Sequence, residues 1–323
     1  MNLKNHYDKI RNDVKNKGTR NLLLVVILVA ALTLTVVALN SSPSTSGVQS
    51  DPYFYVNTAD TEWTGGQTPV YDDIRTAISD AADWSLQTQK EAYVLVTVGH
   101  YSVYPTGHES PIPLENGVTI IGGFSGAESG GSTPTPQNPN NPDDTSANTS
   151  FRGNLSGTMF VADGVDSTAE LQNIVISYGL STSGGGIYIT NGGCPTIEDC
   201  TFYRDFGNGG NGGGMYNDDS SPTLKNCNFI ECGSYSGYSN NNGGGIYNTN
   251  NSSPILTDCT FTGNAATDNG GGIYNTNNSS PILTDCSFTD NGSYYFDDGY
   301  SIYSCYTDNG GGMYSTNGSS RYL

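Results

Sequence analysis

A short motif, GGG followed by Ile or Met and then Tyr, recurs along the second half of this 323-residue chain. A second block of the form P-x-[IL]-x-[DN]-C-x-F follows each of the first four copies. The stretch GGGIYNTNNSSPILTDC occurs twice without a change, at 243–259 and 270–286, which sets a basic period of 27 residues. A fixed period of this length indicates a solenoid, in which each unit stacks on the one before it. The motif copies lie at 184–188, 212–216, 243–247, 270–274 and 310–314, and the second blocks begin at Pro195, Pro222, Pro254 and Pro281.

The residue types in each unit exclude helical repeats. Gly, Asn, Ser and Thr dominate, and the apolar patches are only a few residues long. Within one unit, Ile246 marks a first strand, Leu256 a second, and Cys259 with Phe261 a third. Leu256 and Cys259 are three positions apart, whereas side chains on one face of a strand recur every two. A corner therefore falls between them, at residue types that tolerate left-handed backbone angles: Asp199, Asn226, Asp258 and Asp285.

Three short strands joined by corners make one coil, and stacked coils make parallel sheets. The sequence therefore predicts an all-β, right-handed parallel β-helix. Each coil contributes an Ile or Met, an Ile or Leu, a Cys and a Phe to a shared interior, where each residue lies ~4.8 Å from its equivalents. The predicted columns are Ile187/Met215/Ile246/Ile273/Met313, Ile197/Leu224/Leu256/Leu283, Cys200/Cys227/Cys259/Cys286 and Phe202/Phe229/Phe261/Phe288.

Seven cysteines are present, and four of them occupy one repeat position. In-register stacking would hold their Cβ atoms ~4.8 Å apart, whereas a disulfide needs about 3.8 Å. We therefore expect the four column cysteines to be free, buried thiols, with disulfide pairing as the alternative. Cys194, Cys232 and Cys305 lie off the column and are the better candidates for a bond. A row of stacked thiols does not form the tetrahedral cage of a metal site, so no metal is expected.

The N-terminal segment predicts export. Residues 1–21 are basic, and residues 22–39 form an uncharged apolar run of eighteen residues, close to the ~30 Å needed to cross a bilayer. Since the basic side is N-terminal, the rest of the chain should leave the cell. The run is either a signal anchor, which would tether the chain to the membrane, or a cleaved signal peptide. Residues 40–50 form a flexible polar spacer, and we expect an extracellular or cell-surface location.

Residues 51–115 are predicted to cap the first coil. Tyr53–Val56 has the composition of a strand, and Thr68-Pro69 with the acids after it resembles a helix start. Apolar residues at helical spacing then predict one amphipathic helix over 70–86. Strands are expected at Tyr93–Val98 and Val118–Ile121. The β-helix itself is assigned to 116–323, with a disordered surface insertion at 126–150.

The motifs resemble the polymorphic outer-membrane protein repeats, which carry GGA[ILV] and FxxN signatures in bacterial surface proteins. The first signature appears here as GGG[IM], and the second is intact at Phe261–Asn264 and Phe288–Asn291. It departs at Phe202–Asp205 and Phe229–Cys232, so that any asparagine ladder would be partial. The N-terminal part, with its early strand, the DDIRTAISDA helix and ENGVTIIGGFSG, resembles the cap of exported right-handed β-helix proteins, and the resemblance covers roughly residues 51–323. The resemblance implies surface adhesion or structural display.

The chain carries no convincing catalytic constellation, and we expect neither enzymatic activity nor a cofactor. Asp218-Asp219 and Asp297-Asp298 are acidic pairs, but each lies in a Gly- and Ser-rich loop and is better explained as a solvated turn. His100 and His108 belong to the cap region, and the repeats contain no histidine. A polysaccharide lyase or hydrolase remains the alternative. The net charge of −19, with few basic residues after position 20, excludes a nucleic-acid partner.

A column of tyrosines is the candidate binding surface. Each follows an inward Ile or Met, so alternation places it outside. Beside Asn217, Asn248 and Asn275, these rings could form a flat platform for surface glycans, or they could only stabilise the sheet. The tyrosines are Tyr188, Tyr216, Tyr247, Tyr274 and Tyr314.

Partners other than glycans are also expected from the sequence. Host or neighbour-cell proteins are candidates for a surface adhesin, and residues 22–39 would contact the membrane. After Tyr314 the second repeat block is missing, so either the sequence is a piece of a longer protein or the last coil meets a partner. An uncovered strand edge favours association, so we expect self-association through this coil.

Overall fold

A computed structural model describes residues 52–57, 70–103, 110–126, 134–144, 146–235, 241–297, 302–306 and 309–319. Residues 51–323 form one compact unit. The predictions for 1–21, 22–39 and 40–50 lie outside the described residues.

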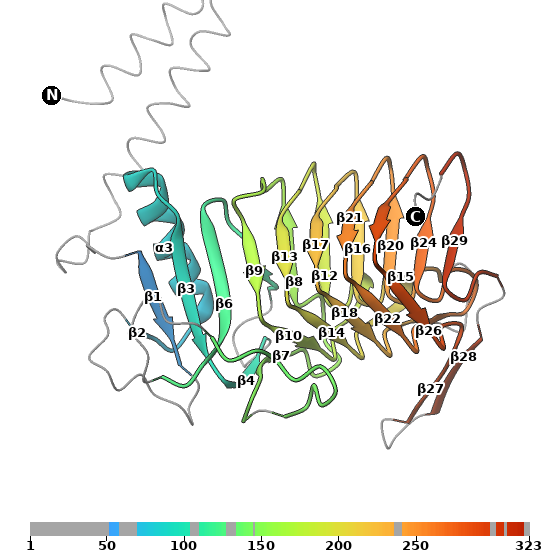
Figure 1. The fold of residues 1–323 in the computed structure, drawn as a ribbon, viewed down its shortest axis with the longest axis horizontal. Helices are drawn as coiled ribbons and strands as arrows, with labels where there is room; N and C mark the ends of the chain where they lie inside the picture. Colours follow the sequence, from blue (N-terminus) through green and yellow to red (C-terminus); the bar gives the residue numbers. More distant parts are fainter. Residues whose placement is uncertain are drawn as a thin grey trace, which may run out of the picture. The chain divides into compact units, whose positions relative to one another are not determined.

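Within the described residues, the chain winds through coils whose strands add to the same sheets in turn (Figure 1). Sheet 1 is the longest and continues without a break from the N-terminal region into the repeats. All of its pairings are parallel. Its strands, in spatial order, are β2 (Val70–Tyr71), β1 (Tyr53–Val56), β3 (Ala92–Thr97), β6 (Val118–Phe124), β9 (Glu170–Gln172), β13 (Thr196–Glu198), β17 (Thr223–Lys225), β21 (Ile255–Thr257) and β25 (Ile282–Thr284).

Two further parallel sheets complete the coil that the sequence predicted. Along each coil, a strand of sheet 2 follows the strand of sheet 1. The Ile or Met and the Tyr of the GGG[IM]Y motif then lie in a strand of sheet 3. Sheet 2 contains β4 (Gly99–Ser102), β7 (Thr149–Arg152), β10 (Val175–Ser177), β14 (Thr201–Tyr203), β18 (Asn228–Ile230), β22 (Thr260–Thr262) and β26 (Ser287–Thr289). Sheet 3 contains β5 (Ile112–Pro113), β8 (Phe160–Asp163), β12 (Ile187–Thr190), β16 (Met215–Asp218), β20 (Ile246–Thr249), β24 (Ile273–Asn275) and β29 (Met313–Ser315).

A fourth strand in several coils was not predicted. It follows the sheet 2 strand and forms sheet 4, from β11 (Leu180–Ser183), β15 (Phe206–Asn211), β19 (Gly233–Tyr235) and β23 (Ala265–Ala266). A separate antiparallel hairpin, β27 (Ser293–Asp297) with β28 (Ile302–Tyr306), interrupts the last repeat. The hairpin comes from an insertion in the last repeat. β23, in contrast, lies inside the basic 27-residue unit at 243–269, where only Ala265 and Ala266 mark it.

The predicted core columns are confirmed by the strand register. Leu224 pairs with Leu256 and Leu256 with Leu283, and the Ile/Met and Phe positions pair in the same way. Phe202, Phe229 and Phe261 are fully buried and stack almost parallel, with ring centroids 4.6 and 4.9 Å apart. One contiguous core runs from the N-terminal strands to Leu283. A parallel β-helix therefore forms as the repeats indicate.

The corner between sheets 1 and 2 also forms as predicted. Asp199, Asn226, Asp258 and Asp285 all adopt left-handed backbone angles, with φ between 48° and 54°. In the GGG motif, the first and second glycines have different structural roles. Gly243 needs a positive φ of 67°, whereas a side chain on Gly244 would collide with the carbonyl oxygens of Ala265 and Gly271 in the next coil. The motif thus lets neighbouring coils approach closely at this turn.

The capping helix begins later than predicted. α3 spans Ile74–Thr88, and Asp73 is its N-cap, with a carboxylate that accepts the Thr76 amide at 3.1 Å. The predicted start at Thr68-Pro69 is wrong, because Val70–Tyr71 form strand β2 instead. The apolar face of α3 packs on β1, β3 and β6 (Figure 1). The amphipathic helix itself is confirmed, and it closes the core at the N-terminal end.

The predicted disorder of 126–150 does not hold for the described part of that segment. Thr149 and Ser150 belong to β7, and residues 134–144 are tied to the coil surface. The Thr135 amide donates to the Gly123 carbonyl at 2.9 Å, and the Gln137 amide donates to Asn173 Oδ1 at 3.0 Å. The proline-rich composition alone suggests disorder. The hydrogen-bond partners that order this segment lie elsewhere in the sequence, so its own composition does not reveal them.

Candidate functional site

The tyrosine column lies on the outer face of sheet 3. Tyr188, Tyr216, Tyr247, Tyr274 and Tyr314 pair in register from β12 to β29 and are half-buried. The rings do not form one flat platform. Tyr188 meets Tyr216 edge to face, at 78°, whereas Tyr247 and Tyr274 stack at 10° with centroids 5.3 Å apart. Tyr274 and Tyr314 also stack, at 15°.

This stacking limits what the tyrosine column can bind. A sugar ring packs on the free face of an aromatic ring, and from Tyr247 to Tyr314 the stacked rings turn their faces toward one another. Burial raises the pKa values of Tyr216, Tyr247 and Tyr274 above their usual range, so these hydroxyls stay protonated. The geometry favours the structural role of the tyrosines, and glycan binding there stays a prediction.

The asparagines expected beside these rings point inward instead. Asn217, Asn248 and Asn275 are fully buried under sheet 3. Asn217 Nδ2 donates to Asn248 Oδ1 at 2.7 Å, and Asn248 Nδ2 donates to Asn275 Oδ1 at 2.8 Å. The predicted contribution of these amides to a surface platform is therefore wrong. They form an internal ladder that joins successive coils.

A second internal ladder occupies the last position of the FxxN motif. Asn264 Nδ2 donates to the Phe229 carbonyl at 2.9 Å, and Asn291 Nδ2 donates to the Phe261 carbonyl at 2.8 Å. Cys232 takes the same place and directs its thiol to the Phe202 carbonyl at 3.4 Å. Asp205 completes the series. Its Oδ1 accepts the Gly179 amide at 2.8 Å, and its Oδ2 is buried without a partner.

Four of the described cysteines, Cys200, Cys227, Cys232 and Cys259, are buried thiols, and Cys194 and Cys286 are half-buried. Cys194, Cys200, Cys227, Cys232, Cys259 and Cys286 are free, so Cys194 and Cys232 do not form the bond considered for them. The free state of the column cysteines is confirmed. Burial raises the pKa of Cys200 to about 12, which keeps it protonated. Cys305 lies where side chains are not described.

The acidic residues and histidines considered as catalytic candidates do not come together in one site among the described residues. Asp218 accepts the Asn250 side-chain amide at 2.7 Å, and Asp219 is a left-handed corner residue with φ of 51°. His100 lies on β4 with an exposed side chain, and partial desolvation together with the nearby charge of Arg152 lowers its pKa. His108 and Asp298 lie outside the described residues. Across the part of the chain that the structure describes, no group of three His, Cys, Asp or Glu side chains could hold a metal ion.

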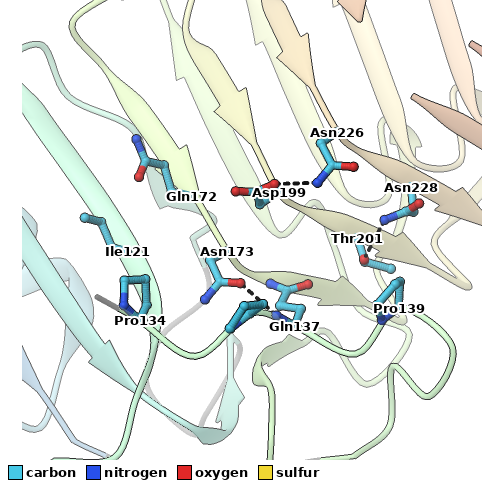
Figure 2. A pocket seen from close by; sticks show the side chains of 11 residues that line it. Ile121, Pro134, Gln137, Pro139, Gln172, Asn173, Asp199, Thr201, Asn226 and Asn228 are labelled. Atoms are coloured by element: carbon cyan, nitrogen blue, oxygen red, sulfur yellow. Dashed lines mark hydrogen bonds between the residues drawn. The ribbon is translucent and has the colours of Figure 1, made fainter. Parts of the chain in front are cut away.

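The segment 134–139 covers a cavity of about 400 Å³ at the corner between sheets 1 and 2 (Figure 2). Its walls are Pro134, Pro136 and Pro139 from the segment and Ile121 from β6. Polar side chains from several coils line the remainder, namely Gln137, Gln172, Asn173, Asp199, Thr201, Asn226 and Asn228. Sequence reasoning missed this site because it treated the covering segment as disordered. The three closely spaced prolines, each with a restricted φ, were the available signal.

Asn173 holds the covering segment in place. This buried residue occupies the left-handed corner position of its coil, with φ of 54°. Its Oδ1 accepts the Gln137 amide, and its Nδ2 donates to the carbonyls of Gly122 and Thr135 at 2.9 and 2.8 Å. The same corner in the next two coils provides Asp199 and Asn226, joined by a 2.6 Å hydrogen bond. The cavity is therefore built on a rigid row of coil corners.

Among the described residues, no helix has both the length and the apolar character needed to cross a membrane. The predicted span at 22–39 lies outside them.

Residues 143–322 match the family model described as a right handed beta helix region, which covers more than half of the chain. Among solved structures, the chain is similar to the crystal structure of YbhC from Escherichia coli, with 14% sequence identity and a TM-score of 0.37. That alignment covers 77% of this chain and 74% of the other. No curated protein matches the chain.

Proposed function

Since this chain belongs to the right-handed β-helix family, we propose that it is an exported cell-surface protein whose β-helix acts as an adhesin-like or structural display domain without catalysis. The observation that carries this proposal is the uninterrupted stack of equivalent coils on one core. Each coil adds a fixed rise of ~4.8 Å and repeats the same outer surface, which suits a rigid spacer or a repeated contact surface.

The outer chemistry of the coils supports a role in contact rather than in turnover. Most of the described left-handed corners carry Asn or Asp, with Tyr178, Arg204 and Glu231 among the exceptions, and several bond the equivalent residue one coil away, as Asn250 does with Asn277 at 3.2 Å. Asparagine amides in such ladders hold the surface rigid and do not titrate, so they cannot act as general acids or bases. The fold by itself hosts many activities, so only this surface chemistry supports the proposed absence of catalysis.

Export is tested by protease treatment of intact cells that produce the chain. We expect the body at 51–323 to be cut without lysis, because the basic residues at 1–21 should remain inside. A control protein of the cytoplasm must stay intact in the same sample. Protection of the body until the cells are lysed would contradict the proposed location.

The absence of catalysis is tested with a panel of acidic and neutral polysaccharides, with and without calcium. We expect no release of reducing ends or unsaturated products. Clear depolymerisation would replace the display role with the alternative, a polysaccharide-active enzyme.

The tyrosine column is tested separately. If the rings bind glycans, replacing Tyr247 and Tyr274 together by Ala lowers retention on a glycan array while the fold persists. The observed stacking favours unchanged retention together with a loss of stability, because the two rings shield each other.

Self-association through the last coil remains part of the proposal. β29 is the outermost strand of sheet 3 within the described residues, and Met313 is only half-buried there. We expect the apparent mass in light scattering to rise with concentration. A strict monomer at high concentration would remove this element and leave the display role intact.

A further inference from the structure

We propose that the row of corner residues that follows sheet 2 is an interface, which binds the same row of a second copy of this chain in the opposite direction. The strands before these corners lie side by side along the stack of coils (Figure 1). The amide of each of the first four corner residues donates to a carbonyl of the next coil, so the row is evenly spaced at ~4.8 Å. The row, called here the sheet 2 corner, consists of Tyr178, Arg204, Glu231, Gly263 and Asp290.

Three residues of the sheet 2 corner are unusual for their backbone conformation. Tyr178, Arg204 and Glu231 have left-handed angles, with φ of 59°, 53° and 53°. Such angles destabilise a residue with a long side chain, so Asn, Asp and Gly take most of these positions. Strain that is kept in three consecutive coils indicates that these side chains have a task. The corner between sheets 1 and 2, in contrast, carries only Asn or Asp at its left-handed positions, namely Asn173, Asp199, Asn226, Asp258 and Asp285.

The side chains of the sheet 2 corner are fixed in place and still reach the surface. Arg204 Nε donates to the Glu231 carboxylate at 2.7 Å, and Arg204 Nη1 donates to the Tyr178 hydroxyl at 3.5 Å. Arg152, at the end of β7 in the preceding coil, lies over the Tyr178 ring at 4.4 Å. The side chains of Arg152, Arg204 and Glu231 remain 30%, 31% and 36% exposed. Tyr and Arg held in this way are typical anchors of protein interfaces.

The order of the residues makes the row complementary to its own reverse. A two-fold axis between Arg204 and Glu231, perpendicular to the stack of coils, brings Arg204 of each copy opposite Glu231 of the other. One coil further out, Tyr178 of each copy lies opposite Gly263 of the other. The corner at Gly263 leaves room for a ring, because the nearest atom to a Cβ placed there is Glu231 Cγ at 3.5 Å. The same symmetry therefore pairs opposite charges and places each ring over a glycine.

The ends of the row extend this match. Two coils out from the axis, Arg152 of each copy comes beside Asp290 of the other, which is exposed. Arg152 already pairs with Asp143 at 3.1 Å, so it would then lie between two carboxylates. Each copy has a net charge of −19, which opposes association in general. At physiological salt this repulsion is screened beyond ~8 Å, so the short-range pairs decide.

The inference deepens the proposed contact role by naming its partner, and it rests on that role. A two-fold axis perpendicular to the coils makes the two β-helices antiparallel, so that their first coils lie at opposite ends of the dimer. Chains anchored through their N-terminal segments would then meet from two facing membranes. The row would thus join like surfaces, which differs from association through the last coil.

The decisive variants reverse the two central charges. Arg204→Glu and Glu231→Arg, each made alone, place like charges opposite each other across the axis. A 1:1 mixture of these two chains restores opposite charges at both positions, and so does the double variant Arg204→Glu/Glu231→Arg. The control is Lys225→Glu, which reverses an exposed charge on β17. The full chain is purified in a non-ionic detergent, and sedimentation equilibrium in density-matched solvent measures association at physiological salt. Circular dichroism confirms that each variant keeps the fold.

We expect the unchanged chain and Lys225→Glu to form a dimer as the concentration rises. Each single reversal should weaken the dimer at least ~tenfold, because the two-fold axis turns one substitution into two lost ion pairs and two repulsions. The 1:1 mixture and the double variant should associate as the unchanged chain does. Recovery in the mixture can arise only if the two positions face each other in different copies.

Four results would overturn the proposal. The first is the lack of any dimer up to ~1 mM, where even a weak specific contact is populated. The second is equal association of a single reversal and the unchanged chain, which would assign the dimer to another surface such as the last coil. The third is a mixture that associates no better than its components, and the fourth is an equal loss in Lys225→Glu. None of these results bears on the protease or depolymerisation experiments, so the dimer and the surface role can fail independently.

Discussion

Asp205 occupies a position that the FxxN motif assigns to asparagine, and replacing it by Asn tests how the inner ladder works. Asp205 is completely buried, and burial raises the pKa of its carboxyl well above the usual value of 3.8. Oδ1 accepts the Gly179 amide, whereas Oδ2 has no partner. In the later coils the equivalent Nδ2 of Asn264 donates to a backbone carbonyl. A protonated Asp205 can imitate that amide, and an ionised one cannot.

The magnitude follows from proton linkage. In the unfolded chain Asp205 ionises near its usual pKa, whereas in the folded chain burial keeps it protonated to higher pH. The folded state then binds more protons, so its stability is highest at low pH and falls as pH rises above ~3.9. The loss is about 1.4 kcal/mol per pH unit, and it stops where the folded carboxyl itself ionises.

Asp205→Asn removes this loss and supplies the missing donor. We expect the variant to match the unchanged chain near pH 4 and to gain ~1.4 kcal/mol over it for each pH unit above that, up to the pKa of the folded carboxyl. Urea unfolding between pH 4 and pH 8 measures the difference, with Asp83→Asn, at an exposed position of α3, as the control. A difference between Asp205→Asn and the unchanged chain that is flat with pH, or that shrinks as pH rises, would refute the reasoning.

Three other substitutions test the stacking, each by urea unfolding followed by circular dichroism. Phe229→Ala should cost ~3–5 kcal/mol, because this buried ring stacks on one above and one below, and a cost under ~1 kcal/mol would argue against the phenylalanine column. Asn248→Ala should cost ~1–3 kcal/mol for each of the two buried amide groups it leaves unpaired, and an unchanged midpoint would contradict the internal ladder. Gly244→Ala should cost at least ~1–3 kcal/mol, since its methyl group would collide with the next coil, and an unchanged midpoint would contradict that close approach.

The repeat was enough to predict the coil and its interior. Leu224, Leu256 and Leu283 recur at one position, and in a stacked coil an equal position means an equal place in space. The corner at Asp258 followed from the three-residue spacing of Leu256 and Cys259. The inward orientation of the asparagines could also have been predicted from the sequence, because alternation along β16 places Asn217 on the face opposite Tyr216.

The repeat pattern could not predict the candidate cavity. The segment 134–139 has no apolar period, and its conformation depends on Asn173 and Gly123, which are distant in sequence or lie in another coil. The unpaired amide of Gln137 appears only when that segment is folded over Asp199 and Asn226. Similarly, the conflict at Asp205 becomes visible only when burial and the lack of a partner are known.

The amino-acid order thus decided on its own which residues repeat, which face inward and how neighbouring coils are registered, because a solenoid makes the same contacts at every turn. Folding in three dimensions decided where the aperiodic segment at 134–144 lies, which side chains it brings together and which polar atoms it leaves without partners. Those outcomes depend on single contacts between distant residues, and no local period records them.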